Sequence, residues 1–329
     1  MDKRRNQQEL QSHPRPLIDP DIHRRAKWRN RINTWLIMGG LTLLLAVSAW
    51  AFFGVTGVMW ALGLGAVFFL FTPRISPAMV LRLYKARTIE PQEAPELFHV
   101  MDVLAKRAEL PETPKLYYVA SSNMNAFAVG RPEDSAITMT DGLLRGLNLR
   151  QLTGVLAHEV SHVANEDLKV MGLADLVGRL TTIMQSIGFF LLFVGLWQGG
   201  RALVAAIVLM LAPTVGTFLQ LALSRSREYD ADLGAVRLTG DPIGLASALQ
   251  TLEHKQGNLW ESVLMPGGRL PDPSVLRTHP KTEDRVARLK ELTPGPDPEL
   301  ETTETKVVVP AAFRRVLHPP RYHMSGFWY

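Results

Sequence analysis

Five consecutive residues, His158-Glu159-Val160-Ser161-His162, have the types and spacing of a zinc-hydrolase site. They lie in the helix-compatible run 152–165. In a helix of 3.6 residues per turn, positions four apart share a face, so both imidazoles can reach one metal ion while Glu159 points to its edge. The pattern predicts catalytic zinc chemistry. The alternative is a surface helix with two solvated histidines.

Two histidines leave a catalytic zinc site one protein ligand short, because such sites use three ligands and a water. Glu166 lies on the same face, but about 12 Å along the axis from His158, and zinc–ligand bonds are about 2 Å long. Asp167 is placed worse still. The elongated motif with a third histidine downstream also fails, because position 168 is a leucine.

The missing ligand must therefore come from a distant segment. Glu228 and Asp232 stand four residues apart in the run 224–232, on one face of an expected helix. One of them can bind zinc while the other holds an imidazole N–H in place. Their spacing alone does not decide which does which.

Long apolar runs must anchor the elements that carry these side chains. From Trp35 to Phe71 there is no charged residue, which would be about 55 Å of straight helix against a hydrocarbon core of about 30 Å. A break at 53–57 gives two spans. A second run, Leu180 to Leu223, divides at 198–201 into spans near 181–198 and 202–223. We expect four transmembrane helices in two hairpins, with a buried core helix or re-entrant hairpin as the alternative.

Charge and cysteine content narrow the protein class further. The net charge is +5, but the basic residues cluster beside the apolar runs, so nucleic-acid binding is not predicted. The turn regions on the other side hold only Arg201, and the positive-inside rule therefore places both termini and the histidine motif in the cytoplasm. The chain has no cysteine, which excludes disulfides and thiolate zinc ligands.

The expected soluble elements place the motif helix beside a small sheet. Helices are predicted at 93–108, from Leu149 onward, at 224–238, 242–256 and 282–292, and strands at 116–120, 126–129 and 136–140. Asp141 is the expected N-cap of a short helix. We expect a mostly helical α+β protein, a zinc protease domain with a small β-sheet joined to four transmembrane helices.

The expected organisation has six segments. They are a basic N-terminal arm (1–31), a first transmembrane hairpin (32–72), the first part of the protease domain (88–177), a second hairpin (178–223), the second part of the domain (224–293) and a C-terminal tail of unknown role (294–329).

Four motifs together resemble the HtpX-like integral-membrane zinc endopeptidases, relatives of the CAAX prenyl proteases, over about residues 30–292. The motifs are His158-Glu-Val-Ser-His162, Arg227-Glu228-Tyr229-Asp-Ala231-Asp232, Asn125-Ala126-Phe127 and Thr278-His279-Pro280. The resemblance implies one Zn²⁺ per chain bound by His158, His162 and Glu228, with Glu159 as general base and Asp232 as the carboxylate that orients an imidazole.

The same resemblance assigns the loop of His279 to the active site. His279 is the expected donor to the tetrahedral oxyanion, supported by Arg285, although a histidine at a helix entry is the plainer interpretation. The segment Asn125, Ala126 and Phe127 is expected at a sheet edge where an extended substrate adds a strand. An ordinary start of a strand is the alternative.

These inferences define an expected function. The chain is expected to hydrolyse misfolded or damaged membrane proteins in the cytoplasmic face of a bacterial inner membrane, as a multi-pass protein whose partners are polypeptide substrates and the lipid bilayer. A CAAX-type prenyl-protein protease and a zinc-binding membrane scaffold without catalysis are the alternatives. The scaffold is disfavoured because a structural zinc site needs no Glu159.

Overall fold

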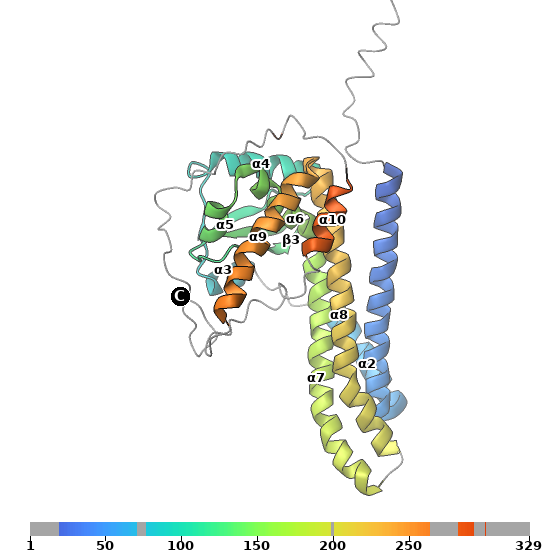
Figure 1. The fold of residues 1–329 in the computed structure, drawn as a ribbon. Coiled ribbons are helices and arrows are strands. Elements are labelled where there is room, and N and C mark those ends of the chain that lie inside the picture. The colour runs from blue at the N-terminus through green and yellow to red at the C-terminus, as the bar shows by residue number, and fades with distance from the viewer. Residues whose placement is uncertain (1–19, 71–76, 199–200, 264–281, 293–299, 301–329) are drawn as a thin grey trace, which may run out of the picture.

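The computed structural model describes residues 20–70, 77–198, 201–263, 282–292 and 300. Long helices form a bundle, and a small α/β part is attached beside one end of it (Figure 1). The element order after the first helix is helix, strand, helix, three strands and then helices only. The protein is thus mostly helical with a small sheet, as predicted.

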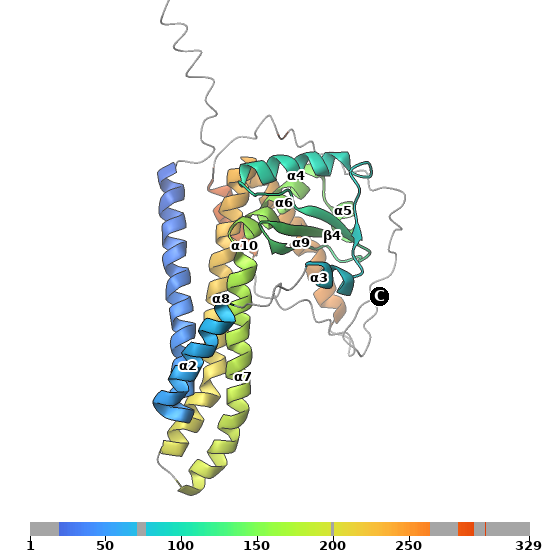
Figure 2. The same ribbon diagram turned by 180° about the vertical axis from the view of Figure 1, so that it is seen from behind.

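The first apolar run forms α2 (Pro20–Leu70), which is bent at Gly54. Gly54 has φ 63° and ψ −149°, a conformation that a residue without Cβ adopts at little cost. Figure 2 shows α2 running along the bundle and then turning back. The predicted break near residues 53–57 is therefore correct. The helix begins at Pro20, so the expected polar arm 1–31 is partly helical.

The second apolar run forms α7 (Asp167–Gln198) and α8 (Arg201–Thr239), which pack along each other. Within the described residues, three helices are long and apolar enough to cross a membrane, through the segments Thr34–Ala51, Asp167–Phe193 and Leu203–Thr239. The second arm of α2 is not among them. Three candidate spans are therefore present, and the fourth stays a prediction.

The spans are not separate from the soluble part. The expected helix 224–238 is the continuation of α8, which runs from Arg201 to Thr239 through Pro213. Likewise α7 starts at Asp167, directly after the motif helix, and continues into the apolar segment. Rigid helices therefore connect the apolar bundle to the elements that carry the histidines.

A four-stranded mixed sheet has the order β1-β2-β4-β3. Strands β2 (Lys115–Val119), β3 (Ala126–Arg131) and β4 (Asp134–Thr140) match the three predicted strands, and β2 runs parallel to β4 while β3 is antiparallel to it. The sequence did not predict β1 (Arg87–Thr88), which is only two residues long. In the described part of the chain, β3 forms one edge of the sheet.

The remaining helices pack on this sheet and on α8. They are α3 (Pro77–Leu83), α4 (Pro95–Arg107), α5 (Asp141–Gly146), α6 (Leu149–Ala164), α9 (Pro242–Val263) and α10 (Thr282–Lys290). The N-cap of α5 is Thr140 and not Asp141, since the Thr140 side chain accepts from Leu143 N–H. Asp141 instead accepts from the Tyr118 hydroxyl at 3.1 Å.

The motif helix α6 begins at a capping box. Asn148 accepts from the Gln151 backbone N–H at 2.8 Å, and the Gln151 side chain accepts from Asn148 N–H at 3.1 Å. Most of α6 is buried between the sheet, α8 and α9. The helix is therefore fixed on several sides, which suits a helix that must hold two ligands in register.

Candidate metal centre and active site

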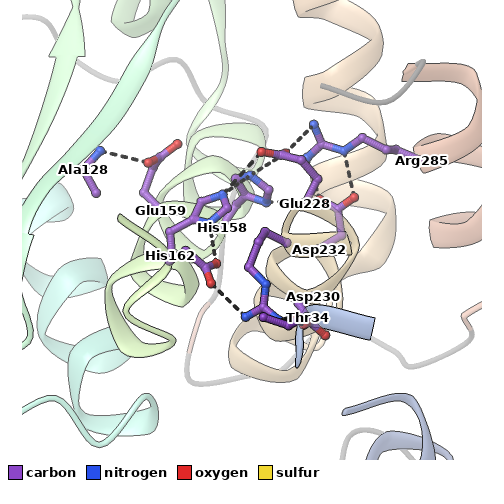
Figure 3. A network of polar contacts seen from close by, with 11 residues as sticks. Thr34, Ala128, His158, Glu159, His162, Glu228, Asp230, Asp232 and Arg285 are labelled. Carbon is purple, nitrogen blue, oxygen red and sulfur yellow. Dashed lines mark hydrogen bonds and ion pairs between the residues drawn. The ribbon is translucent and has the colours of Figure 1, made fainter. Parts of the chain in front are cut away.

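Side chains from α6 and α8 converge on one point (Figure 3). The Nε2 atoms of His158 and His162 are 3.1 Å apart. Glu228 contributes Oε2 at 3.4 Å from His158 Nε2 and Oε1 at 3.7 Å from His162 Nε2. One donor atom from each of the three residues lies within 4.8 Å of the others.

This donor set fits zinc. Ligand atoms about 2.0–2.2 Å from a tetrahedral ion lie about 3.3 Å from one another. The two Nε2 atoms are 3.1 Å apart, and each lies 3.4 or 3.7 Å from one of the two oxygens of Glu228, which is close to that value. His158 and Glu228 are each only 6% exposed, so the site is shielded from bulk water on the sides that they form.

Each histidine is backed by a carboxylate and each carboxylate by an arginine. His158 Nδ1 lies 3.1 Å from Asp232 Oδ1, and Arg285 donates to both oxygens of Asp232 at 2.8 and 2.6 Å. Arg285 Nη1 is also 3.2 Å from Glu228 Oε2. This pairing orients the first imidazole and compensates two buried negative charges.

The second histidine has a corresponding arrangement. His162 Nδ1 lies 2.8 Å from Asp167 Oδ2, and Arg227 donates to Asp167 Oδ1 at 3.1 Å. Arg227 also contacts Thr34 on α2 and lies 3.4 Å from Asp230. The first apolar helix is thereby connected to His162, one of the three candidate ligands, through two side chains.

These contacts shift the pKa values of the histidines and of Arg285. Burial lowers the pKa of His158, but Asp232 and Glu228 outweigh it and raise that pKa to about 10. Burial also opposes the charged form of His162, and Asp167 raises its pKa above the ordinary value. Burial opposes ionisation of Arg285 as well, but Asp232 keeps its pKa raised. The carboxylates therefore favour the protonated form of the imidazoles beside them.

Glu159 points away from the metal-binding atoms toward the sheet (Figure 3). Its Oε2 accepts from the backbone N–H of Ala128 on β3 at 3.0 Å, and the side chain is half-buried. The residue lies between the paired histidines and the edge strand. It thus links the motif helix to the edge strand of the sheet.

The structure brings together most of the residues singled out in the sequence. His158, Glu159, His162, Glu228, Asp232 and Arg285 lie in one network, and Asn125, Ala126 and Phe127 lie at the start of β3. His279 falls outside the described residues. The sequence did not identify Asp167 and Arg227 as parts of the site.

Comparison with known proteins agrees with this geometry. The model of peptidase family M48 matches residues 91–293, which include the converging donors and the edge strand. The chain belongs to peptidase family M48. It is therefore a metallopeptidase, and the three converging donors form its possible zinc site.

Relatives of this M48 peptidase are similar over most of their length. A protease HtpX homologue of Acaryochloris marina is 38% identical over 278 residues, which cover 80% of this chain and 94% of that protein. One from Thermococcus sibiricus is 35% identical over 281 residues, covering 79% and 95%. The crystal structure of S. mikatae Ste24p aligns with TM-score 0.44 and 21% identity, covering 80% of this chain and 66% of that one.

Proposed function

We propose that this M48 peptidase is a membrane-embedded zinc endopeptidase that hydrolyses misfolded or damaged membrane proteins at the cytoplasmic surface. The main support is the convergence of His158, His162 and Glu228 at the point where α6 meets two helices that continue into apolar segments. A protease built in this way takes polypeptide substrates close to the bilayer. We further propose a bacterial inner membrane as its location.

One Zn²⁺ would be held by His158, His162 and Glu228, and when bound it would supply a Lewis acid and a water acidified to a pKa near 7. Asp232 and Asp167 would keep the two ring Nδ1 atoms as hydrogen-bond donors. Arg285 would hold Asp232 and Glu228 in place and limit the repulsion between them. Each ligand would thus be oriented before metal binding.

Glu159 would act as general base and then as general acid. It would take a proton from the attacking water and return it to the leaving amine, a contribution typically worth about 10²–10⁴-fold in rate. Its carboxylate accepts a hydrogen bond from Ala128 N–H. That contact holds the carboxylate beside the edge strand, where the scissile bond would lie.

The open edge of β3 would bind the substrate main chain. Thr140 N–H donates to Asn125 at 3.0 Å, and the antiparallel register pairs Phe127 with Thr138. Because hydrogen-bonded pairs alternate along such a ladder, Ala126 and Ala128 direct their main-chain polar groups away from β4. An extended substrate could add there as a strand, which is the proposed role of the segment that begins at Asn125.

His279 stays a predicted donor to the oxyanion. Arg285 lies in the first half of α10, six residues after His279 in sequence, and its Nη1 is 3.2 Å from Glu228 Oε2. Loss of one such donor typically costs about 3 kcal/mol in the barrier. In sequence, His279 comes three residues before α10, and this order supports the prediction.

The test uses full-length protein in detergent, with zinc removed by chelator and then restored. Wild type should cleave an unfolded membrane-protein fragment only when zinc is present. Glu159→Gln should retain one zinc per chain and lose cleavage, since it keeps the shape but not the base. Glu166→Gln is the matched control, because that glutamate is exposed, and it should both bind zinc and cut.

Two outcomes would contradict the proposal. Cleavage by Glu159→Gln at the wild-type rate would show that Glu159 is not the general base. Zinc binding without turnover by wild type would favour a non-catalytic scaffold. Cleavage of a farnesylated peptide in preference to its unmodified twin would instead support a prenyl-protein protease.

A further inference from the structure

Helix α3 (Pro77–Leu83) presents two apolar side chains to its surroundings. Met79 is 71% exposed and Leu83 is 54% exposed, and as residues four apart they share one face. Leu81 is buried against the domain. Single exposed apolar residues are ordinary, but this pair stands beside the exposed basic residues Arg82 and Lys85. A short apolar face bordered by cations is typical of a helix in a membrane interface.

The position of α3 suits such an interface. In both views it lies at the edge of the α/β part nearest the apolar length of the bundle (Figures 1 and 2). In sequence it follows α2, the first apolar helix, after residues 71–76. The chain therefore enters the soluble part through α3.

The level of the bilayer can be located on α7. Asp175 and Arg179 form an exposed ion pair at 2.8 Å, and exposed apolar residues follow directly with Leu180 and Ile183. Charged pairs belong in water or among headgroups, and exposed apolar side chains belong in hydrocarbon. The boundary therefore crosses α7 just after Arg179. In Figures 1 and 2, α3 lies at the level of the upper part of α7.

We propose that α3 rests in the lipid interface of the bilayer that holds the helices, with Met79 and Leu83 among the upper acyl carbons and Arg82 and Lys85 at lipid phosphates. This inference rests on the proposed placement of the bundle in a membrane. The occupant is phospholipid, because α3 is the element that follows the first apolar helix in the chain and its charges complement anionic headgroups.

This contact would also position the active site. Tyr84, directly after α3, packs against Phe127 of β3 with ring centroids 5.0 Å apart. The lipid contact would thus keep the edge strand close to the bilayer surface. A substrate segment leaving the membrane would meet β3 within a short length of chain.

A fluorescence experiment tests the placement directly, and the absence of cysteine makes labelling specific. Full-length Met79→Cys carries an environment-sensitive nitrobenzoxadiazole label and is reconstituted in phosphatidylcholine–phosphatidylglycerol vesicles. The matched control is Lys106→Cys. Lys106 is exposed, and its helix α4 lies at the opposite edge of the α/β part (Figure 1). In these vesicles the label at position 79 should emit at shorter wavelength than the label at 106. Spin-labelled lipids should quench the label at 79 and leave the one at 106 unchanged.

Equal quenching at the two positions would overturn the proposal. A blue shift at position 79 in dilute detergent that grows with protein concentration would assign the face to a second copy of the chain, and this also overturns it. Labelling reports on α3 whether or not the protein cleaves anything. Its failure is therefore distinguishable from failure of the proposed function.

A functional comparison adds a second readout. Met79→Glu combined with Leu83→Glu should lower cleavage of a membrane-inserted substrate in vesicles several-fold and leave cleavage of an unfolded soluble substrate in detergent unchanged. Both side chains are exposed, so the fold should tolerate the change. Equal rates for variant and wild type in vesicles would contradict a role of α3 at the membrane.

Discussion

Asp167→Asn tests whether the carboxylate behind His162 tunes the metal site. Asp167 lies 2.8 Å from His162 Nδ1 and accepts from Arg227 at 3.1 Å. Asparagine has nearly the same shape but no charge, so it weakens both contacts without leaving a cavity. The variant isolates electrostatics from packing.

The expected magnitude follows from these contacts. Removing a partner that orients a metal-binding histidine typically lowers metal affinity about 10–100-fold, or about 1.4–2.7 kcal/mol. Arg227 would lose its shortest carboxylate contact but keep Asp230 at 3.4 Å. The metal-free protein should therefore lose only about 1–3 kcal/mol of stability, the usual range for an imperfectly compensated buried polar group.

The assay is zinc competition against a chromogenic chelator, with full-length protein in detergent. Asp175→Asn is the matched control, since Asp175 is also on α7 but exposed and paired only with Arg179 among the contacts described for it. Exposed pairs contribute little, so this variant should bind zinc as wild type does. An Asp167→Asn protein that binds zinc within about twofold of wild type would refute the reasoning.

Two further predictions concern packing and protons. Gly234→Ala should weaken zinc binding and stability, because a Cβ there would lie 2.9 Å from Ser161 Cβ and push α8 away from α6; Gly172→Ala, with open space around it, is the control, and equal effects in thermal unfolding would contradict this. Metal-free protein should release protons when zinc binds at pH 7, because the pKa of His158 is raised to about 10. The stability linked to this imidazolium is present below about pH 6.5 and is lost toward pH 10, so zinc affinity should rise over that window. Proton release is measured by calorimetry in two buffers of different ionisation enthalpy. A zinc affinity that does not change with pH, or binding without proton release, would contradict the prediction.

Local patterns were enough to predict much of the fold. The strands β2 to β4 and the glycine at the turn of α2 are features of short segments, and the structure contains both. The extent of α8 was not predictable in the same way. The sequence changes from apolar to charged near residue 224, which predicts the end of a helix there. The helix instead continues to Thr239.

The role of Asp167 was missed because helical spacing was extended too far. Glu166 adopts φ 52°, which ends the turn after α6 and redirects the chain into α7. Asp167 then faces His162 instead of following it around the helix. Helical spacing alone argues against Asp167 as a zinc ligand and gives no reason to expect it behind His162.

Arg227 illustrates a different limit. In the sequence, Arg227 follows the apolar run that ends at Leu223 and counts among the basic residues that indicate the cytoplasmic side. In the structure it is only 8% exposed and contacts Asp167 and Thr34, which are far from it in sequence. Long-range ion pairs of this kind depend on how the helices pack, and a charge count cannot separate them from solvated charges.

The most direct test of the account is a zinc-edge anomalous difference map from crystals of the zinc-loaded Glu159→Gln protein. The account predicts one peak per chain, about 2.0–2.2 Å from the Nε2 atoms of His158 and His162 and from a carboxylate oxygen of Glu228. A peak that lacks Glu228, or one held by another residue in its place, would contradict the proposed metal centre.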